Sequence, residues 1–199
     1  MNGPDHRQSL AGNAQTRVPL GHAGADAALQ GGLRLGALHE IFAVSGHEGA
    51  ATGFAAGLAA RVNKPLLWIC QDFSALEFGE LCPTGLLEFG LDPSRMFLFR
   101  AANAEDAMRA ALDALSCAAL GAIVIEIPGA PKILDLVASR RLTLAAAQKN
   151  VAAILLRLAA EPDASTAETR WRISAASKEK NWFHPVFETE LIRNRAGRM

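Results

Sequence analysis

Short apolar runs punctuate the middle of the chain, and each is bounded by glycine, proline or polar residues. Runs of this length and composition are typical of strands buried on both sides. We predict strands at Leu38–Val44, Pro65–Cys70, Met96–Arg100, Ala122–Ile127 and Val151–Arg157.

The segments between these runs carry apolar residues at helical spacing. Asn103 is a good N-cap, with acidic residues in the turn that follows it. In the last helix, Leu134, Val137, Ala138 and Leu142 fall on one side. We predict helices at Phe54–Arg61, at Ser74–Phe89 with an interruption near Cys82–Pro83, after Asn103, and at Leu134–Gln148.

Strands that alternate with helices in this way predict an α/β fold: a mostly parallel sheet with helices on both faces. The end of the chain differs. From Thr169 to Ala175, apolar and polar residues alternate, which is typical of a half-buried, antiparallel strand. Phe187–Arg193 is predicted as a last edge strand.

The chain has 199 residues, half of them hydrophobic, which suits a single domain with a sizeable core. Residues 1–30 are rich in Gly, Ala, Gln and Asn and are predicted to form a flexible leader, with a short helix at Ala25–Gln30. We assign the domain to residues 31–176 and a C-terminal interaction tail to residues 177–199.

Lys and Arg balance Asp and Glu at 20 each, so the net charge does not favour a nucleic-acid or membrane binder. The three cysteines form no CxxC pair, which fits a reducing compartment and argues against a zinc site. No secretion signal or membrane-length apolar run is recognised. These features predict a cytoplasmic protein without a metal or cofactor.

The turn after the first predicted strand is where a sheet of this class binds phosphate. A working phosphate loop needs glycines, a lysine for the β- and γ-phosphates, and a hydroxyl for magnesium. This turn has no lysine before Lys64, and Glu48 would repel a triphosphate by about 1 kcal/mol or more. We predict a degenerate nucleotide loop made of Ser45, Gly46, His47, Glu48, Gly49 and Thr52.

Two carboxylates could keep some chemistry in this site. His47 and Glu48 could act as an acid–base pair, although adjacent residues need not converge, and a polar turn at a helix start explains them more simply. Glu126 ends the fourth predicted strand, where nucleotide hydrolases commonly hold magnesium. Because the loop lacks its lysine, we interpret Glu126 as a remnant of such a site.

Taken in order, these motifs resemble RecA, and more narrowly the ImuA family of RecA-related bacterial proteins. The resemblance covers about two thirds of the chain. It rests on GALHEIF (Gly36–Phe42), PLLWIC (Pro65–Cys70), GLLEFGLDPSR (Gly85–Arg95), LDLVASRRLTLAA (Leu134–Ala146) and TRWRISAAS (Thr169–Ser177). The cell-division inhibitor SulA shares the truncated RecA-like core and is the competing relative.

The resemblance implies a RecA-like fold and a role in the DNA-damage (SOS) response, in which translesion synthesis causes induced mutagenesis. The implied partners are an ImuB-like inactive Y-family polymerase and an error-prone C-family DNA polymerase. RecA itself is a further candidate, and DNA contact is expected to be indirect. We therefore expect a non-catalytic accessory subunit. A DNA-stimulated RecA-like ATPase and a SulA-like inhibitor remain the alternatives, and weak ATP binding stays open.

Two groups of residues are candidates for partner binding. The first is an aromatic run near the C-terminus, which could equally fold back onto the domain. The second is a pair of arginines on the last predicted helix, which could face solvent, an acidic partner or DNA phosphates. These residues are Trp182, Phe183, His184, Phe187, Arg140 and Arg141.

Overall fold

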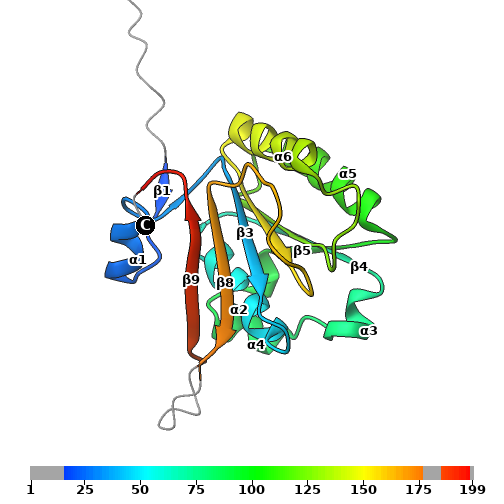
Figure 1. Cartoon of the computed structure of the whole chain (residues 1–199), viewed down its shortest axis with the longest axis horizontal. Helices are drawn as coiled ribbons and strands as arrows, with labels where there is room; N and C mark the ends of the chain where they lie inside the picture. Colours follow the sequence, from blue (N-terminus) through cyan, green and yellow to red (C-terminus); the bar gives the residue numbers. More distant parts are fainter. Residues whose placement is uncertain (1–15, 177–184, 198–199) are drawn as a thin grey trace, which may run out of the picture.

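The computed structural model describes residues 16–176 and 185–197, which form an α/β domain (Figure 1). Its seven-stranded sheet has the order β5-β4-β6-β7-β3-β8-β9. The strands are β3 (Leu38–Ala43), β4 (Leu66–Gln71), β5 (Met96–Ala101), β6 (Ala122–Glu126), β7 (Ala152–Arg157), β8 (Thr169–Ala175) and β9 (Phe187–Asn194).

The predicted fold class is confirmed: six strands are mutually parallel, and β9 alone runs antiparallel within this sheet. The arrangement is consistent with a RecA-like fold. One detail of the prediction is wrong, because β8 pairs parallel with β3 and is antiparallel only to β9. The alternating pattern of β8 reflects its place near the sheet edge, where one side is less covered.

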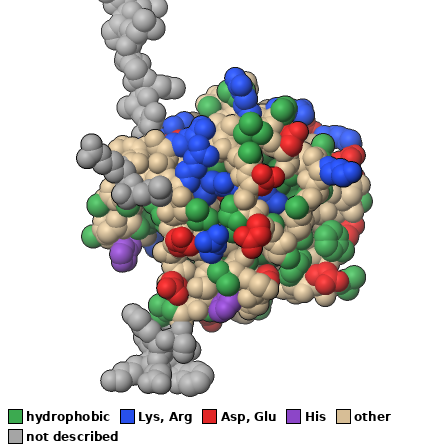
Figure 2. All heavy atoms as spheres, in the orientation of Figure 1, with side chains coloured by type: hydrophobic (Ala, Val, Ile, Leu, Met, Phe, Trp, Pro, Cys, Tyr) green, Lys and Arg blue, Asp and Glu red, His purple; other side chains and the backbone are tan. Residues whose placement is uncertain are grey.

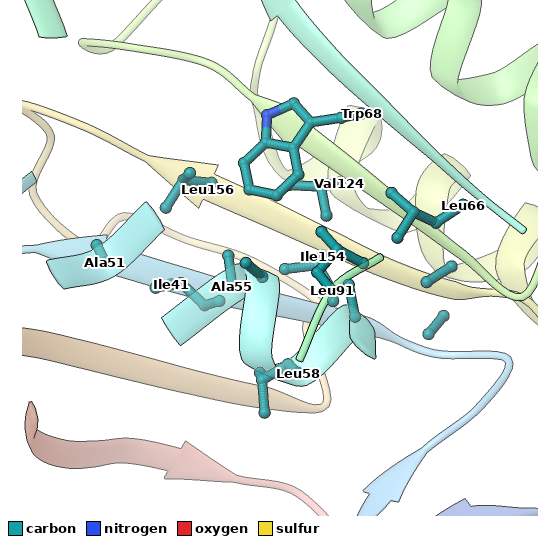
Figure 3. Packing of buried hydrophobic residues seen from close by; sticks show 14 of the residues in the cluster. Ile41, Ala51, Ala55, Leu58, Leu66, Trp68, Leu91, Val124, Ile154 and Leu156 are labelled. Carbon is teal, nitrogen blue, oxygen red and sulfur yellow. The ribbon is translucent and has the colours of Figure 1, made fainter. Parts of the chain in front are cut away.

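Helices cover both faces of the sheet (Figure 1). On one face lie α2 (Glu48–Ala60) and α4 (Pro83–Glu88), and on the other lie α5 (Ala104–Ala114) and α6 (Leu136–Lys149). Figure 3 shows the first core, in which Trp68 and its neighbours from the sheet pack against the small side chains of α2. Trp171 is buried in the same core.

The helix ends follow the chemistry expected of them. The Asn103 side chain accepts a hydrogen bond from the Asp106 N–H at 2.9 Å, and Asp135 caps α6 in the same way. The segment after β4 divides into α3 (Ser74–Phe78) and α4, so the predicted interruption at Cys82–Pro83 is confirmed. The phosphate-loop helix starts earlier than predicted, at Glu48.

Part of the predicted N-terminal leader is folded. Residues 16–30 contain β1 (Arg17–Val18), which pairs with β2 (Leu33–Arg34), and α1 (Ala23–Ala28). Leu29 is buried, and the Arg17 guanidinium donates to its carbonyl. The leader prediction therefore fails for residues 16–30, which pack on the domain through Leu20 and Leu29, while residues 1–15 lie outside the described residues.

The predicted boundary at residue 177 also cuts through a folded unit, because β9 pairs along the whole of β8. Phe187, the first residue of β9, packs against Phe54 and Phe89 at ring-centroid distances of 6.2 and 5.5 Å. At the opposite edge of the sheet, the predicted strand Met96–Arg100 was expected to be covered on both faces. Instead, Phe97, Leu98 and Phe99 of β5 are exposed.

Strand β3 carries two buried polar side chains. His39 Nε2 donates to the Arg34 carbonyl at 2.8 Å, so its Nδ1 accepts from the Thr169 hydroxyl at 2.7 Å. Glu40 accepts from Arg170 Nε and from the Ser165 hydroxyl, both at 2.6 Å. These bonds tie β3 to β8 through side chains as well as through the backbone.

Among the described residues, no helix is both long enough and apolar enough to cross a membrane.

Candidate functional site

The turn between β3 and α2 lies at the carboxyl end of β3, where open α/β sheets place their ligands. The turn is tight: the His47 N–H donates to the Val44 carbonyl at 2.8 Å. Gly46 has φ +81°, a left-handed conformation that glycine adopts without strain. Residues 44–47 therefore form a tight connection from the end of β3 to the start of α2.

Glu48 occupies the donor that such a turn would offer to an anion. The Gly46 N–H donates to Glu48 Oε1 at 3.1 Å. Glu48 is also the first residue of α2, where a carboxylate interacts favourably with the positive end of the helix dipole. The Glu48 carboxylate thus satisfies a backbone donor of the turn from within the chain.

His47 is also engaged within the chain. Its Nδ1 accepts from the Ala175 backbone N–H at 3.0 Å, at the end of β8. The two adjacent side chains therefore bind different partners, His47 on β8 and Glu48 on Gly46. This geometry gives no support to their interpretation as an acid–base pair.

The position of the missing lysine can be located in the helix. If Thr52 is taken as the hydroxyl residue of the phosphate-loop pattern, Ala51 stands in the lysine position, and Ser45 and Ala50 stand where the pattern has its glycines. Ala51 is fully buried in the core beneath α2. This position packs the helix onto the sheet.

A cavity of about 210 Å³ brings three of the predicted residues together. Gly49, Thr52 and Glu126 line it, along with residues of α4 and of the segment before it. Glu80 also lines the cavity and is ion-paired with Arg100. No lysine, arginine or histidine is among its lining residues within the described part of the chain, so nothing there compensates a triphosphate.

Glu126 sits at the end of β6, almost fully buried, and accepts a hydrogen bond from Trp68 Nε1 at 3.3 Å. Burial raises the pKa of this carboxyl, and the Trp68 bond offsets only part of the effect. A raised pKa favours the neutral acid, which is a poor magnesium ligand. The structure therefore places Glu126 at the end of a central strand, buried beside the Trp68 indole and the Ser74 side chain.

Phe89 closes one side of the cavity. Its ring lies so close to Gly53 of α2 that a Cβ at Gly53 would come within 2.5 Å of it. The glycine is therefore required for packing, not for ligand approach.

The predicted partner-binding residues lie in different places. Arg140 and Arg141 are exposed on α6, as one of the alternatives held. Phe187 folds back onto the domain, whereas Trp182, Phe183 and His184 lie outside the described residues. These residues do not form a single site in the described structure.

A groove of about 470 Å³ runs between α5 and α6, and sequence reasoning missed it. Val137, predicted to face the core with Ala138 and Leu142, is instead 64% exposed and lines this groove with Arg141. Figure 2 shows Lys and Arg side chains gathered over these helices with hydrophobic side chains between them. The exposed apolar residues beside the two arginines are Ile133, Leu136, Val137 and Leu144.

The architecture is that of an α/β domain consistent with a RecA-like fold, and the turn before α2 binds a carboxylate of its own chain. In comparisons with known proteins, no protein-family model matches the chain, and no curated protein matches its sequence significantly.

Proposed function

We propose that the chain is a non-catalytic accessory subunit of an error-prone translesion synthesis complex in the bacterial SOS response. It acts through protein–protein contacts. The proposal that the chain is non-catalytic rests on the hydrogen bond from Gly46 to Glu48, which places a side-chain carboxylate where an anion would bind. The adjoining cavity lacks basic residues, which further disfavours a triphosphate.

The partner classes rest on the resemblance of the sequence to the ImuA family. They are an ImuB-like inactive Y-family polymerase and an error-prone C-family DNA polymerase, with RecA as a further candidate. A cytoplasmic location follows from the same role.

The α5–α6 surface is the best candidate for these contacts. Exposed apolar residues beside arginines are typical of interface anchors. Its groove is lined by three acidic and three basic residues, whereas a nucleic-acid site needs a clear excess of positive charge. The mixed charge favours a protein partner over DNA phosphates. The charged residues are Glu105, Asp113, Asp135, Arg109, Lys132 and Arg141.

Co-purification with the two polymerase-related partners tests this proposal. The double variant Arg140→Glu, Arg141→Glu should reduce partner recovery at least tenfold. The control Lys64→Glu reverses an exposed charge away from this surface and should leave recovery unchanged. A full chain that recovers neither partner, or a double variant that binds as well as the original chain, would contradict the assignment.

The C-terminal residues are better tested by substitution than by truncation, because removing everything after residue 177 also removes β9 from the sheet. Trp182→Ala and Phe183→Ala leave β9 in place. Loss of recovery in these variants, with the arginine variant unaffected, would move the interface from α6 to the tail.

A further inference from the structure

The outer edge of β5 is unprotected. Within the described residues no strand pairs with that edge, yet its side chains are apolar: Phe97, Leu98 and Phe99 are 63%, 44% and 43% exposed. Monomeric proteins usually protect edge strands with charges, prolines or bulges. The opposite edge follows that rule, since β9 exposes Glu188 and Glu190. The contrast within one sheet marks the β5 edge as an interaction surface.

The backbone of β5 offers a regular set of free hydrogen-bonding groups. The Ala101 carbonyl accepts from the Asp72 N–H at 2.9 Å, so it points toward β4. Because backbone groups alternate in direction along a strand, those of Phe97 and Phe99 also point toward β4. Those of Met96, Leu98 and Arg100 point outward, away from the sheet.

We propose that β5 pairs antiparallel with β5 of a second copy of this chain, across a two-fold axis at Leu98. Such an axis is perpendicular to the sheet, so each face of the sheet in one copy continues the same face in the other. Leu98 then lies opposite Leu98 of the second copy. Phe97 then lies opposite Phe99 of the second copy, and Met96 opposite Arg100. The outward backbone groups of Met96, Leu98 and Arg100 then meet their counterparts.

The sequence of the strand favours a second copy over a different protein. Arg100 is its one charged residue, and Glu80 of the same chain already pairs with it. The exposed edge of β5 therefore has no free charge that would attract a partner strand of opposite charge. Its apolar order is symmetric about Leu98, and cross-strand aromatic pairs such as Phe97 with Phe99 stabilise antiparallel sheets. This inference does not depend on the proposed function.

Sedimentation velocity of the full chain tests the dimer. The weight-average mass should rise toward twice the monomer mass as concentration increases into the high micromolar range. Leu98→Lys places two like charges at the axis and should raise the dissociation constant at least tenfold. Leu87→Lys, a comparably exposed leucine on α4, should leave it unchanged.

Hydrogen exchange on the unmodified chain provides a test that needs no variant. The N–H groups of Leu98 and Arg100 should become protected as concentration rises, whereas those of Phe97 and Phe99 should not change. A chain that remains monomeric throughout, or a dimer that Leu98→Lys leaves intact, would overturn the proposal.

Discussion

The carboxylate of Glu48 accepts a hydrogen bond from the backbone N–H of Gly46, two residues earlier, at 3.1 Å. In a nucleotide-binding turn this donor would face a phosphate oxygen. The chain has kept the turn and its left-handed glycine, but it fills the anion position from within. The Glu48 carboxylate therefore stabilises the turn and occupies the backbone donor that a phosphate would use.

Replacing Glu48 with glutamine should lower the free energy of unfolding by about 1 kcal/mol, because both the charged hydrogen bond and the helix-dipole interaction weaken. Urea unfolding measures the loss. Glu105→Gln is the matched control: it removes a carboxylate from the first turn of α5. This control variant should lower the free energy of unfolding by about 0.3 kcal/mol. Equal losses in the two variants would show that the Gly46 bond contributes nothing.

Two glycines of α2 should respond oppositely to alanine. At Gly53 the new methyl group would collide with the Phe89 ring, so Gly53→Ala should destabilise the fold by about 1–3 kcal/mol. At Gly57 the nearest atom would lie 4.0 Å away, so Gly57→Ala should stabilise the helix by about 0.5–1 kcal/mol. Thermal unfolding of the pair checks both signs. If Gly53→Ala is also stabilising, Phe89 does not pack against the helix as described.

His39 should make the fold sensitive to acid. Burial lowers the pKa of its imidazole from 6.5 to about 4, so in the folded state it stays neutral where the unfolded chain takes up a proton. The free energy of unfolding therefore decreases as the pH falls from 6.5 to about 4, and His39 causes no further decrease below that pH. The loss is about 3 kcal/mol, since one pKa unit corresponds to about 1.4 kcal/mol.

His39→Gln can keep both hydrogen bonds, to Thr169 and to Arg34, without a titrating group. Urea unfolding at a series of pH values should show a shallower acid dependence for this variant than for the original chain. If the two curves run parallel between pH 6.5 and 4, the buried imidazole is not the acid-sensitive group.

Two arginines on β8 should differ greatly in importance. Arg170 is buried and pairs with buried Glu40 at 2.6 Å, so Arg170→Met should cost about 3 kcal/mol or more by leaving a carboxylate without its partner. Arg172 pairs with Glu190 at the surface at 2.8 Å, so Arg172→Met should cost less than about 1 kcal/mol. Similar losses at both positions, measured by urea unfolding, would contradict this difference in burial.

Apolar runs were enough to predict the sheet, because strands covered by helices on both faces carry a strong and simple signal. The same rule failed at Met96–Arg100, since an apolar run does not reveal whether its strand lies in the centre of the sheet or at its edge. The alternating pattern of β8 did not predict its direction relative to β3, because alternation shows that one side of a strand is exposed and not how the strand is oriented. These properties depend on strand order, which only the packed structure establishes.

The missing lysine and the presence of Glu48 could be read from the motif, but the contact with Gly46 could not, because it depends on one side-chain rotamer. The α5–α6 groove was equally out of reach. Val137 was grouped with Ala138 and Leu142, but at 3.6 residues per turn it lies about 140° around the helix from Leu142, and it is exposed.

The central claim is that the chain keeps the frame of a nucleotide-binding domain and has lost its nucleotide site. Calorimetric titration of the purified chain with magnesium-ATP tests this most directly. We expect the titration to show no saturable binding up to millimolar nucleotide. A dissociation constant in the micromolar range would contradict it, because it would require the triphosphate to displace Glu48 from Gly46 without a lysine to hold it.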